Sequence, residues 1–186
     1  GFHHATVDSV AERAEVSKGT VYLYFESKES LLAHLLLDGL EDLIGELESA
    51  HAEAKAAPAE EQLRVLARAY VSFFRRDPQY FPFLMAMDRG RFQDAIPPEL
   101  YQRVLEASLE GLNLAVGVVA RGCREGAFEC RDPQQAACVF WAALNGALQL
   151  MEHPLRRELV RVDETVLYEA SISSGIRALQ TAPNSG

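Results

Sequence analysis

Leucine recurs every three or four positions in one stretch of the chain, and this spacing constrains the fold more than any other feature. A helix advances about 100° per residue, so residues at this spacing share one face. The residues of that face are Leu32, Leu36, Leu40, Leu43 and Leu47. No stretch shows the apolar and polar alternation of a half-buried strand. The chain is therefore expected to be all-α.

Capping residues and prolines set the ends of the helices. Ser27 precedes the leucine-bearing helix as an N-cap, and Pro58 ends it. Asp132, followed by proline at the first helical position, begins a later helix. The other helices are expected at about 7–14, 18–24, 59–76, 98–124, 133–151 and 163–180, with a short or bent helix in PQYFPFLMAM and a loop at DAIPPEL. These ranges leave no helix between about 152 and 162.

Charge and hydropathy exclude two classes of protein. The net charge is −9, whereas a protein that coats nucleic acid is basic, so any DNA-contacting surface must be a small part of an acidic body. No apolar run approaches the roughly 20 residues of a transmembrane helix. No basic segment followed by an apolar one marks a secretory signal. We therefore expect a globular cytoplasmic protein without a membrane partner.

The potential metal ligands are few and badly spaced. Cys123, Cys130 and Cys138 are separated by seven and eight residues, which fits neither a CxxC site nor a secreted disulfide framework. We interpret them as free, mostly buried thiols in a reducing compartment. His3 and His4 have no Cys or carboxylate partner at ligand spacing, so no metal site and no cofactor are expected.

Two short helices near the N-terminus form a helix-turn-helix candidate. Thr6 and Ser17 are their expected N-caps, and Glu15 and Val16 form the tight turn between them. The residues expected to pack between the two helices are Val10, Ala14, Val16, Val21 and Phe25. Packing of this kind leaves the opposite arc of the second helix free to meet a partner.

That opposite arc has the residue types of a surface that enters a DNA groove. It carries Gly19, Thr20, Tyr22 and Leu23, with Lys18 at its edge. Glycine allows close approach, while tyrosine offers a hydroxyl for phosphates and a flat ring for thymine methyls. The helix N-termini capped by Ser17 and Ser27 are places where a phosphate can be bound.

The stretch TVDSVAERAEVSKGTVYLYFESKESLLAHLL resembles the DNA-binding region of the TetR family of transcriptional regulators. The resemblance covers about residues 1–36 and follows the family's pattern of a Val-Ser-Lys-Gly-Thr turn, an aromatic-rich helix, and Ser-Lys-Glu before a long leucine-rich helix. It implies eight DNA-contact positions, which are Thr6, Ser17, Lys18, Gly19, Thr20, Tyr22, Tyr24 and Lys28.

Two departures from the family pattern stand out. Glu15 occupies a position that is usually glycine, so the turn must form without one. The family's first helix would precede Gly1, and residues 1–31 carry three basic against five acidic side chains. We therefore expect the residues that precede Gly1 to be basic and to contain this helix.

The resemblance also implies a homodimer whose last two long helices form the interface. Small or polar residues at helical spacing in both helices agree with close approach of a second copy, although packing within one chain is the alternative. These residues are Ala136, Ala143, Gly146 and Ala147 in the first helix, and Val166, Ala170, Ser173 and Arg177 in the second. Two recognition helices related by a two-fold axis read half-sites about 34–36 Å apart, which predicts a near-palindromic operator.

The larger part of the chain is expected to bind a small effector, as in TetR-like proteins. Aromatic residues and methionines gather there with a few polar side chains, as a mostly apolar ligand site requires. The candidate ligand residues are Phe73, Phe74, Phe81, Phe83, Met87, Tyr101, Trp141 and Asn145. The alternative for each of them is an ordinary place in the core.

The sequence as a whole predicts a DNA-binding regulator, a repressor that a small apolar or aromatic effector releases from duplex DNA. We expect a partial DNA-binding domain at 1–31, an effector-binding and dimerisation domain at 32–181, and a disordered tail at 182–186. No nucleophile elbow, zinc-protease motif, Walker loop or dinucleotide fingerprint is present, so no enzyme is expected. The alternative is a helical small-molecule-binding protein without DNA-binding activity.

Overall fold

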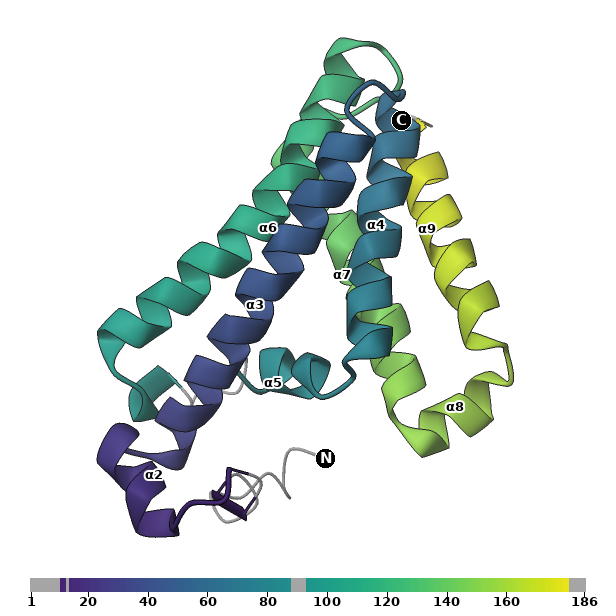
Figure 1. The fold of residues 1–186 in the computed structure, drawn as a ribbon. Helices are drawn as coiled ribbons and strands as arrows, with labels where there is room; N and C mark the ends of the chain where they lie inside the picture. Colours follow the sequence, from purple (N-terminus) through teal and green to yellow (C-terminus); the bar gives the residue numbers. More distant parts are fainter. Residues whose placement is uncertain (1–10, 13, 88–92, 181–186) are drawn as a thin grey trace. The chain divides into compact units, whose positions relative to one another are not determined.

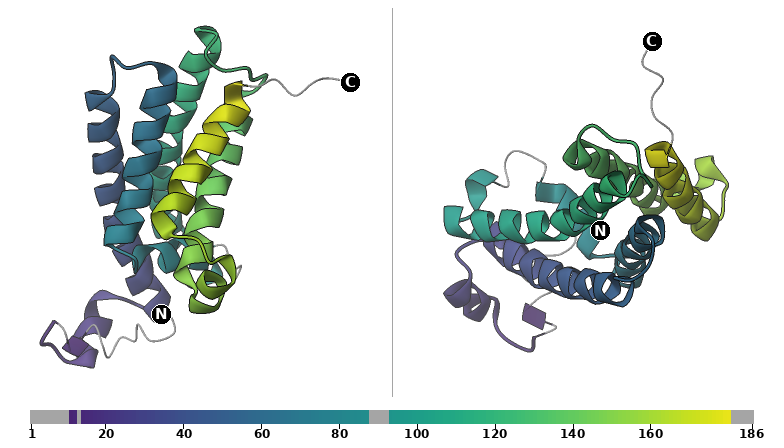
Figure 2. Two further views of the ribbon diagram at one scale, coloured as in Figure 1. Left: turned by 90° about the vertical axis from the view of Figure 1, so that its right-hand side faces the viewer. Right: turned by 90° about the horizontal axis from the view of Figure 1, so that it is seen from above.

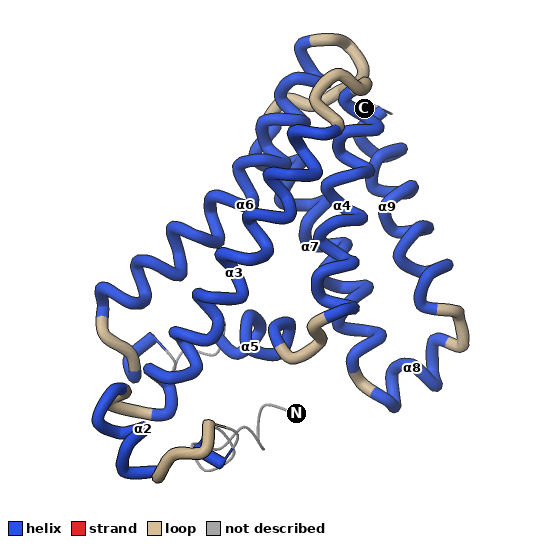
Figure 3. The backbone as a smooth tube through the Cα atoms, viewed as in Figure 1, coloured by secondary structure: helices blue, strands red, loops and turns tan. Residues whose placement is uncertain are grey.

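A computed structural model gives the fold and describes residues 11, 12, 14–87 and 93–180. All the regular elements among these residues are helices (Figures 1 and 3). In chain order they are α2 (Lys18–Tyr24), α3 (Lys28–Glu53), α4 (Ala59–Arg76), α5 (Tyr80–Met87), the 3-10 helix η2 (Gln93–Ala95), α6 (Pro98–Arg124), α7 (Pro133–Glu152), α8 (Pro154–Val160) and α9 (Glu164–Gln180). The prediction of an all-α fold is confirmed.

Most expected helices lie where the caps and prolines placed them, but α8 was missed. This helix has the sequence PLRRELV, starts with proline and buries none of its residues. Its seven residues are too few to repeat the spacing of Leu155 and Leu159, so the pattern does not reveal it. The short element η2 falls within a predicted loop. Thr6, most of the helix expected at 7–14, and the tail at 182–186 lie outside the described residues.

The chain divides into two compact units. The first comprises residues 1–42 and 77–108, and the second residues 43–76 and 109–186. Helices α2 and α5 belong to the first unit, α4 and α7 to α9 belong to the second, and α3 and α6 each have residues in both.

The first unit holds its N-terminal helices together with a small apolar cluster. Ala11, Val21 and Leu31 are buried in it, and Phe25 and Leu35 pack against them. The sequence placed Ala14 and Val16 in this contact, but both are exposed. Both residues belong to the turn, which leaves the helical face on which Ala11 lies. Ala11 and Leu31 are buried in the cluster, where Ala14 and Val16 were expected.

In the second unit, α9 packs against both α4 and α7 (Figures 1 and 2). Buried aliphatic and aromatic side chains from the three helices form the core between them, among them Leu63, Phe73, Leu144, Ile172 and Ile176. Phe140 of α7 lies against Gly175 of α9, where any Cβ would overlap its ring. This close approach of the ring to the α9 backbone needs a glycine.

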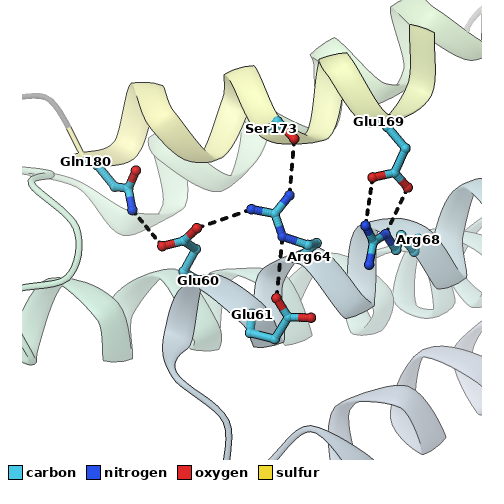
Figure 4. Close-up of polar contacts among 7 residues, drawn as sticks. All are labelled: Glu60, Glu61, Arg64, Arg68, Glu169, Ser173 and Gln180. Carbon is cyan, nitrogen blue, oxygen red and sulfur yellow. Dashed lines mark hydrogen bonds and ion pairs between the residues drawn. The ribbon is translucent and has the colours of Figure 1, made fainter. Parts of the chain in front are cut away.

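A row of polar contacts runs along the outer edge between α4 and α9 (Figure 4). The contacts join Gln180 to Glu60 at 2.7 Å, Arg64 to Ser173 at 3.2 Å, Arg68 to Glu169 at 2.8 Å and Arg75 to Glu164 at 2.7 Å. Residue numbers rise along α4 as they fall along α9, so the two helices are antiparallel. The row fixes which turn of α9 lies beside each turn of α4.

The cysteines differ from the prediction of three free thiols. Cys123 and Cys130 form a disulfide, with their Cα atoms 6.2 Å apart, and only Cys138 is free. The bond forms because α6 ends at Arg124 and the positive φ of Gly126 turns the chain back on itself. The loop is also held by Phe128, which is buried against Gly122. The prediction is therefore wrong, and the cysteines no longer indicate a reducing compartment.

Candidate functional site

The turn before α2 is made without glycine, as the sequence required. Glu15 adopts a left-handed conformation with φ of 55°. The Glu15 N–H donates to the Glu12 carbonyl at 3.1 Å, and the Val16 N–H donates to the Ala11 carbonyl at 2.9 Å. These two bonds form a Schellman motif, which normally has glycine at the left-handed position. The turn therefore forms at a conformational cost that Glu15 bears.

Helix α2 is capped and anchored locally. The Ser17 Oγ accepts a hydrogen bond from the Thr20 N–H at 3.0 Å and lies 2.8 Å from the Thr20 Oγ1. At the other end the Phe25 N–H donates to the Val21 carbonyl. Val21 alone among the α2 residues is buried, so the helix is held to the first unit by one edge.

The remaining side chains of α2 project away from the apolar cluster. Tyr22 is 47% exposed, Tyr24 79% and Leu23 83%, and Lys18 and Gly19 are exposed as well. Thr20 is half-buried beneath its contact with Ser17. A short helix that shows solvent two tyrosines and a leucine has a surface suited to a partner.

The eighth predicted position, Lys28, begins the next helix. Lys28 is half-buried at the start of α3, where the Ser27 Oγ accepts from the Ser30 N–H at 3.0 Å. Thr6 lies outside the described residues. Seven of the eight predicted DNA-contact residues therefore lie together on α2, its cap and the first turn of α3.

Two predicted ligand residues meet in the second unit. Trp141 and Asn145, one turn apart on α7, both contact the hydroxyl of Tyr70 on α4. The indole Nε1 donates to this hydroxyl at 3.1 Å, and the hydroxyl donates to the Asn145 Oδ1 at 2.7 Å. Burial raises the pKa of Tyr70 well above its usual range, which keeps the hydroxyl protonated and able to donate. The sequence named Tyr70 among the aromatic residues but did not predict this polar junction.

The other predicted ligand residues fall in two places. Phe73 and Phe74 are buried on α4 in the second unit, and Phe74 makes edge-to-face contacts with Tyr70 and Phe73 at centroid distances of 5.0 and 5.2 Å. Phe81 is buried and Tyr101 half-buried in the first unit. Phe83 and Met87 lie on α5 of the same unit. Four of the eight residues therefore belong to each unit.

An exposed stripe of apolar and small residues runs along α7 and α9. On α7 it comprises Val139, Ala143, Gly146 and Leu150, and on α9 it comprises Val166 and Ala170. Two residues of the predicted interface lie elsewhere: Ala147 is buried, and Ser173 accepts a hydrogen bond from Arg64. Ala147 faces the core and Ser173 faces α4, so packing within the chain accounts for both.

Metal and membrane sites are absent from the part of the chain that the structure describes. There, no three His, Cys, Asp or Glu residues form a group that could hold a metal ion. Within the same residues, no helix is both long and apolar enough to pass through a bilayer.

Comparison with known proteins gives the family of the N-terminal module. Residues 1–35 match the family model described as bacterial regulatory proteins, tetR family. This match covers about a fifth of the chain and places the similarity to the TetR family in its N-terminal module. This agrees with the sequence resemblance, and the proteins that the chain resembles are transcriptional regulators rather than enzymes.

Two curated relatives extend the similarity beyond the N-terminal module. The fatty acid metabolism regulator protein of Bacillus subtilis (strain 168) is 28% identical over 68% of the chain, and the HTH-type transcriptional repressor KstR2 of Rhodococcus jostii (strain RHA1) is 25% identical over 69%. The matched parts span 61% and 60% of these two relatives, which is less than two thirds of their own length.

Solved structures show the same fold. The TetR-family regulator PfmR from Thermus thermophilus has a TM-score of 0.71 at 20% identity, and the match covers 99% of this chain and 92% of that one. The regulator FadR from Bacillus subtilis, solved in complex with stearoyl-CoA, has a TM-score of 0.72 at 22% identity. The match covers 95% of this chain and 89% of that one.

Proposed function

We propose that this chain is a DNA-binding transcriptional regulator of the TetR family whose α2 enters the major groove. One observation carries the proposal: α2 buries only Val21 and exposes Tyr22, Leu23 and Tyr24 in the module that matches the family. A groove about 12 Å wide admits such a helix. Exposed tyrosines and a leucine would otherwise be an unfavourable surface for a small helix.

The proposed contacts divide between phosphates and bases. Lys18 and Lys28 supply positive charge, Ser17 and Thr20 supply hydroxyls, and Gly19 lets the backbone approach the duplex. Tyr22 and Tyr24 add hydroxyl and ring contacts, and Thr6 completes the set. The proposed DNA-binding domain covers residues 1–31, and the proposed effector-binding and dimerisation domain covers 32–181.

We further propose that the protein acts as a homodimer on a near-palindromic operator in the cytoplasm. The exposed stripe on α7 and α9 supports this, because small residues flanked by valine and leucine suit the close approach of two identical helix pairs. Substitution of Ala143 or Gly146 by arginine should give a monomer by sedimentation. A sedimentation profile of an intact dimer for both variants would place the interface elsewhere.

The proposed outcome of binding is repression, relieved by an apolar effector that carries an acyl chain. The similar fatty acid metabolism regulator and the FadR structure with stearoyl-CoA support an acyl chain, and the similar repressor KstR2 supports repression. The proposed effector residues of the second unit are Phe73, Phe74, Trp141 and Asn145. Those of the first unit are Phe81, Phe83, Met87 and Tyr101. Helix α3, which is continuous through both units, is the proposed route of coupling.

Binding to DNA tests the regulator itself. We expect full-length protein to bind a duplex from its own upstream region, or one selected from random sequences. Tyr22→Ala should weaken binding without unfolding the protein. Lys28→Ala removes one phosphate contact from each subunit of the dimer, so it should make the slope of log affinity against log salt less negative by about two. Absence of binding to any duplex would leave the chain as a helical ligand-binding protein.

Thermal shift and linkage test the effector. Stearoyl-CoA should raise the melting temperature, whereas free coenzyme A and an aromatic acid serve as controls for the headgroup and for a flat apolar ligand. The effector must then weaken operator binding by the factor by which the operator weakens effector binding. Operator affinity that stays constant at saturating effector would rule out release by this ligand.

A further inference from the structure

The most exposed large apolar side chain in the described part of the chain is Leu23, at 83%. Leu23 lies on α2, in the first unit. An aliphatic side chain in this position gains nothing from water and contributes nothing to the apolar cluster that Val21 enters. A leucine so placed would gain from an apolar contact, and the residues that the structure describes do not supply one.

The position of Leu23 on the helix is central to the outward surface. At about 100° per residue, Leu23 lies about 200° from Val21, on the side opposite the anchor. Gly19 lies one turn earlier on the same side, with only the Ser17 Oγ within 4 Å of where its Cβ would be. The side of α2 opposite Val21 therefore has no side chain at Gly19 and an isobutyl group at Leu23. Tyr22 and Thr20 lie on either side of Leu23 around the helix.

The chemistry of Leu23 limits what it can recognise in a groove. It has no polar atom with which to read the donors and acceptors of base edges. The one apolar substituent that a base pair presents in the major groove is the C5-methyl group of thymine. The flanking Tyr22, Tyr24 and Thr20 hydroxyls can bond to phosphates or polar edges, which leaves the methyl group to the leucine.

We propose that Leu23 is a specificity-determining residue that selects a thymine in each operator half-site through its methyl group. The proposal rests on the proposed DNA-binding function and adds the base that one residue reads. According to the proposal, the protein recognises one base pair of each half-site by a single methyl group.

Single replacements of thymidine by deoxyuridine, which remove only this methyl group, test the proposal. The operator is first selected from random duplexes with the full-length protein, and each thymidine is then replaced in turn. For the unmodified protein, one position per half-site should lose affinity by roughly three- to tenfold, the effect of removing one methyl-sized apolar contact. All other positions should change by less than about twofold.

Two variants separate the contact from a general effect. Leu23→Ala removes the contact in both half-sites, so it should bind the unmodified operator roughly ten- to a hundredfold more weakly and become insensitive to deoxyuridine at either position. Leu109→Ala makes the same change at an exposed leucine of α6 and should keep the pattern of the unmodified protein. Circular dichroism and the melting temperature of both variants should match the unmodified protein, because neither side chain is buried.

The outcomes distinguish this proposal from the one on which it rests. If the protein binds a selected duplex but no deoxyuridine replacement weakens it, or Leu23→Ala keeps the full deoxyuridine effect, Leu23 does not read a methyl group and the regulator stands. If no duplex is bound by the unmodified protein, the regulator itself is wrong.

Discussion

Arg68 of α4 and Glu169 of α9 pair at two points, with the Nε and Nη2 atoms each 2.8 Å from a different carboxylate oxygen. Their hydrogen bonds lower the pKa of Glu169 and raise that of Arg68. The two side chains are 49% and 41% exposed. Solvent therefore screens the pair, and its geometry serves to set the register of α9 more than to stabilise the fold.

A double-mutant cycle of Arg68→Ala and Glu169→Ala should give a coupling free energy of about 0.5–1 kcal/mol at neutral pH. Because the folded pKa of Glu169 lies below its ordinary value of 4.5, the coupling is present above that pH and disappears as the pH falls through the folded pKa. Urea unfolding at several pH values measures it. Arg103 and Glu41, whose closest atoms are 3.8 Å apart, form a control pair with weaker coupling. Equal coupling at neutral and strongly acidic pH would contradict an ionic origin.

Replacement of Glu15 by glycine should stabilise the protein by about 1 kcal/mol, because glycine adopts the left-handed conformation without the penalty of a side chain. The φ of Glu15 is 55°. Glu15→Ala removes the same charge but keeps the penalty, so it is the matched control and should leave the free energy of unfolding nearly unchanged. Similar gains from both variants would mean that the charge, and not the backbone, is responsible.

Reduction of the Cys123–Cys130 disulfide should destabilise the second unit. The bond closes a loop with a sequence separation of 7, for which loop-closure entropy gives about 2–3 kcal/mol. Alkylation followed by mass spectrometry should find one reactive thiol before reduction and three after it. A variant with serine at both positions should show the lower stability and no further response to a reductant. A response in that variant would trace the effect to another group.

Two glycines of α3 should respond in opposite ways to alanine. At Gly39 a Cβ would overlap the Tyr80 ring of α5, whereas at Gly45 nothing lies within 4 Å. Gly39→Ala should therefore cost about 1–3 kcal/mol, and Gly45→Ala should gain up to about 1 kcal/mol from helix propensity. Thermal unfolding measures both. In a Tyr80→Ala background the Gly39 substitution should become favourable, and if it stays unfavourable the ring is not the obstacle.

Local signals in the sequence were enough for most of the fold. Ser17, Ser27 and Asp132 cap the helices that they were predicted to cap, because an N-cap depends on its own side chain and the next turn. The residues that face the core were harder to predict. Ala14 and Val16 are exposed because they lie in a turn where glycine is usual. Ala147 and Ser173 face neighbouring helices of the chain, whose positions no local pattern gives.

The disulfide and the polar junction of Tyr70 depend on long-range geometry. Cys123 and Cys130 meet because Gly126 reverses the chain, and a spacing of seven residues does not indicate that reversal. Tyr70 lies 75 residues before the Asn145 that accepts its hydrogen bond. The candidate DNA-contact residues were recognised more readily, since seven of them lie within twelve consecutive positions.

The hydrogen bond from Trp141 to Tyr70 also gives the protein a built-in optical reporter. The chain contains a single tryptophan, and its indole N–H is bonded to a side chain of another helix while its ring is 39% exposed. Its emission therefore comes from one known place, where α4 and α7 touch. Any ligand or second copy that alters this contact should shift the emission wavelength in solution, without a label attached to the protein.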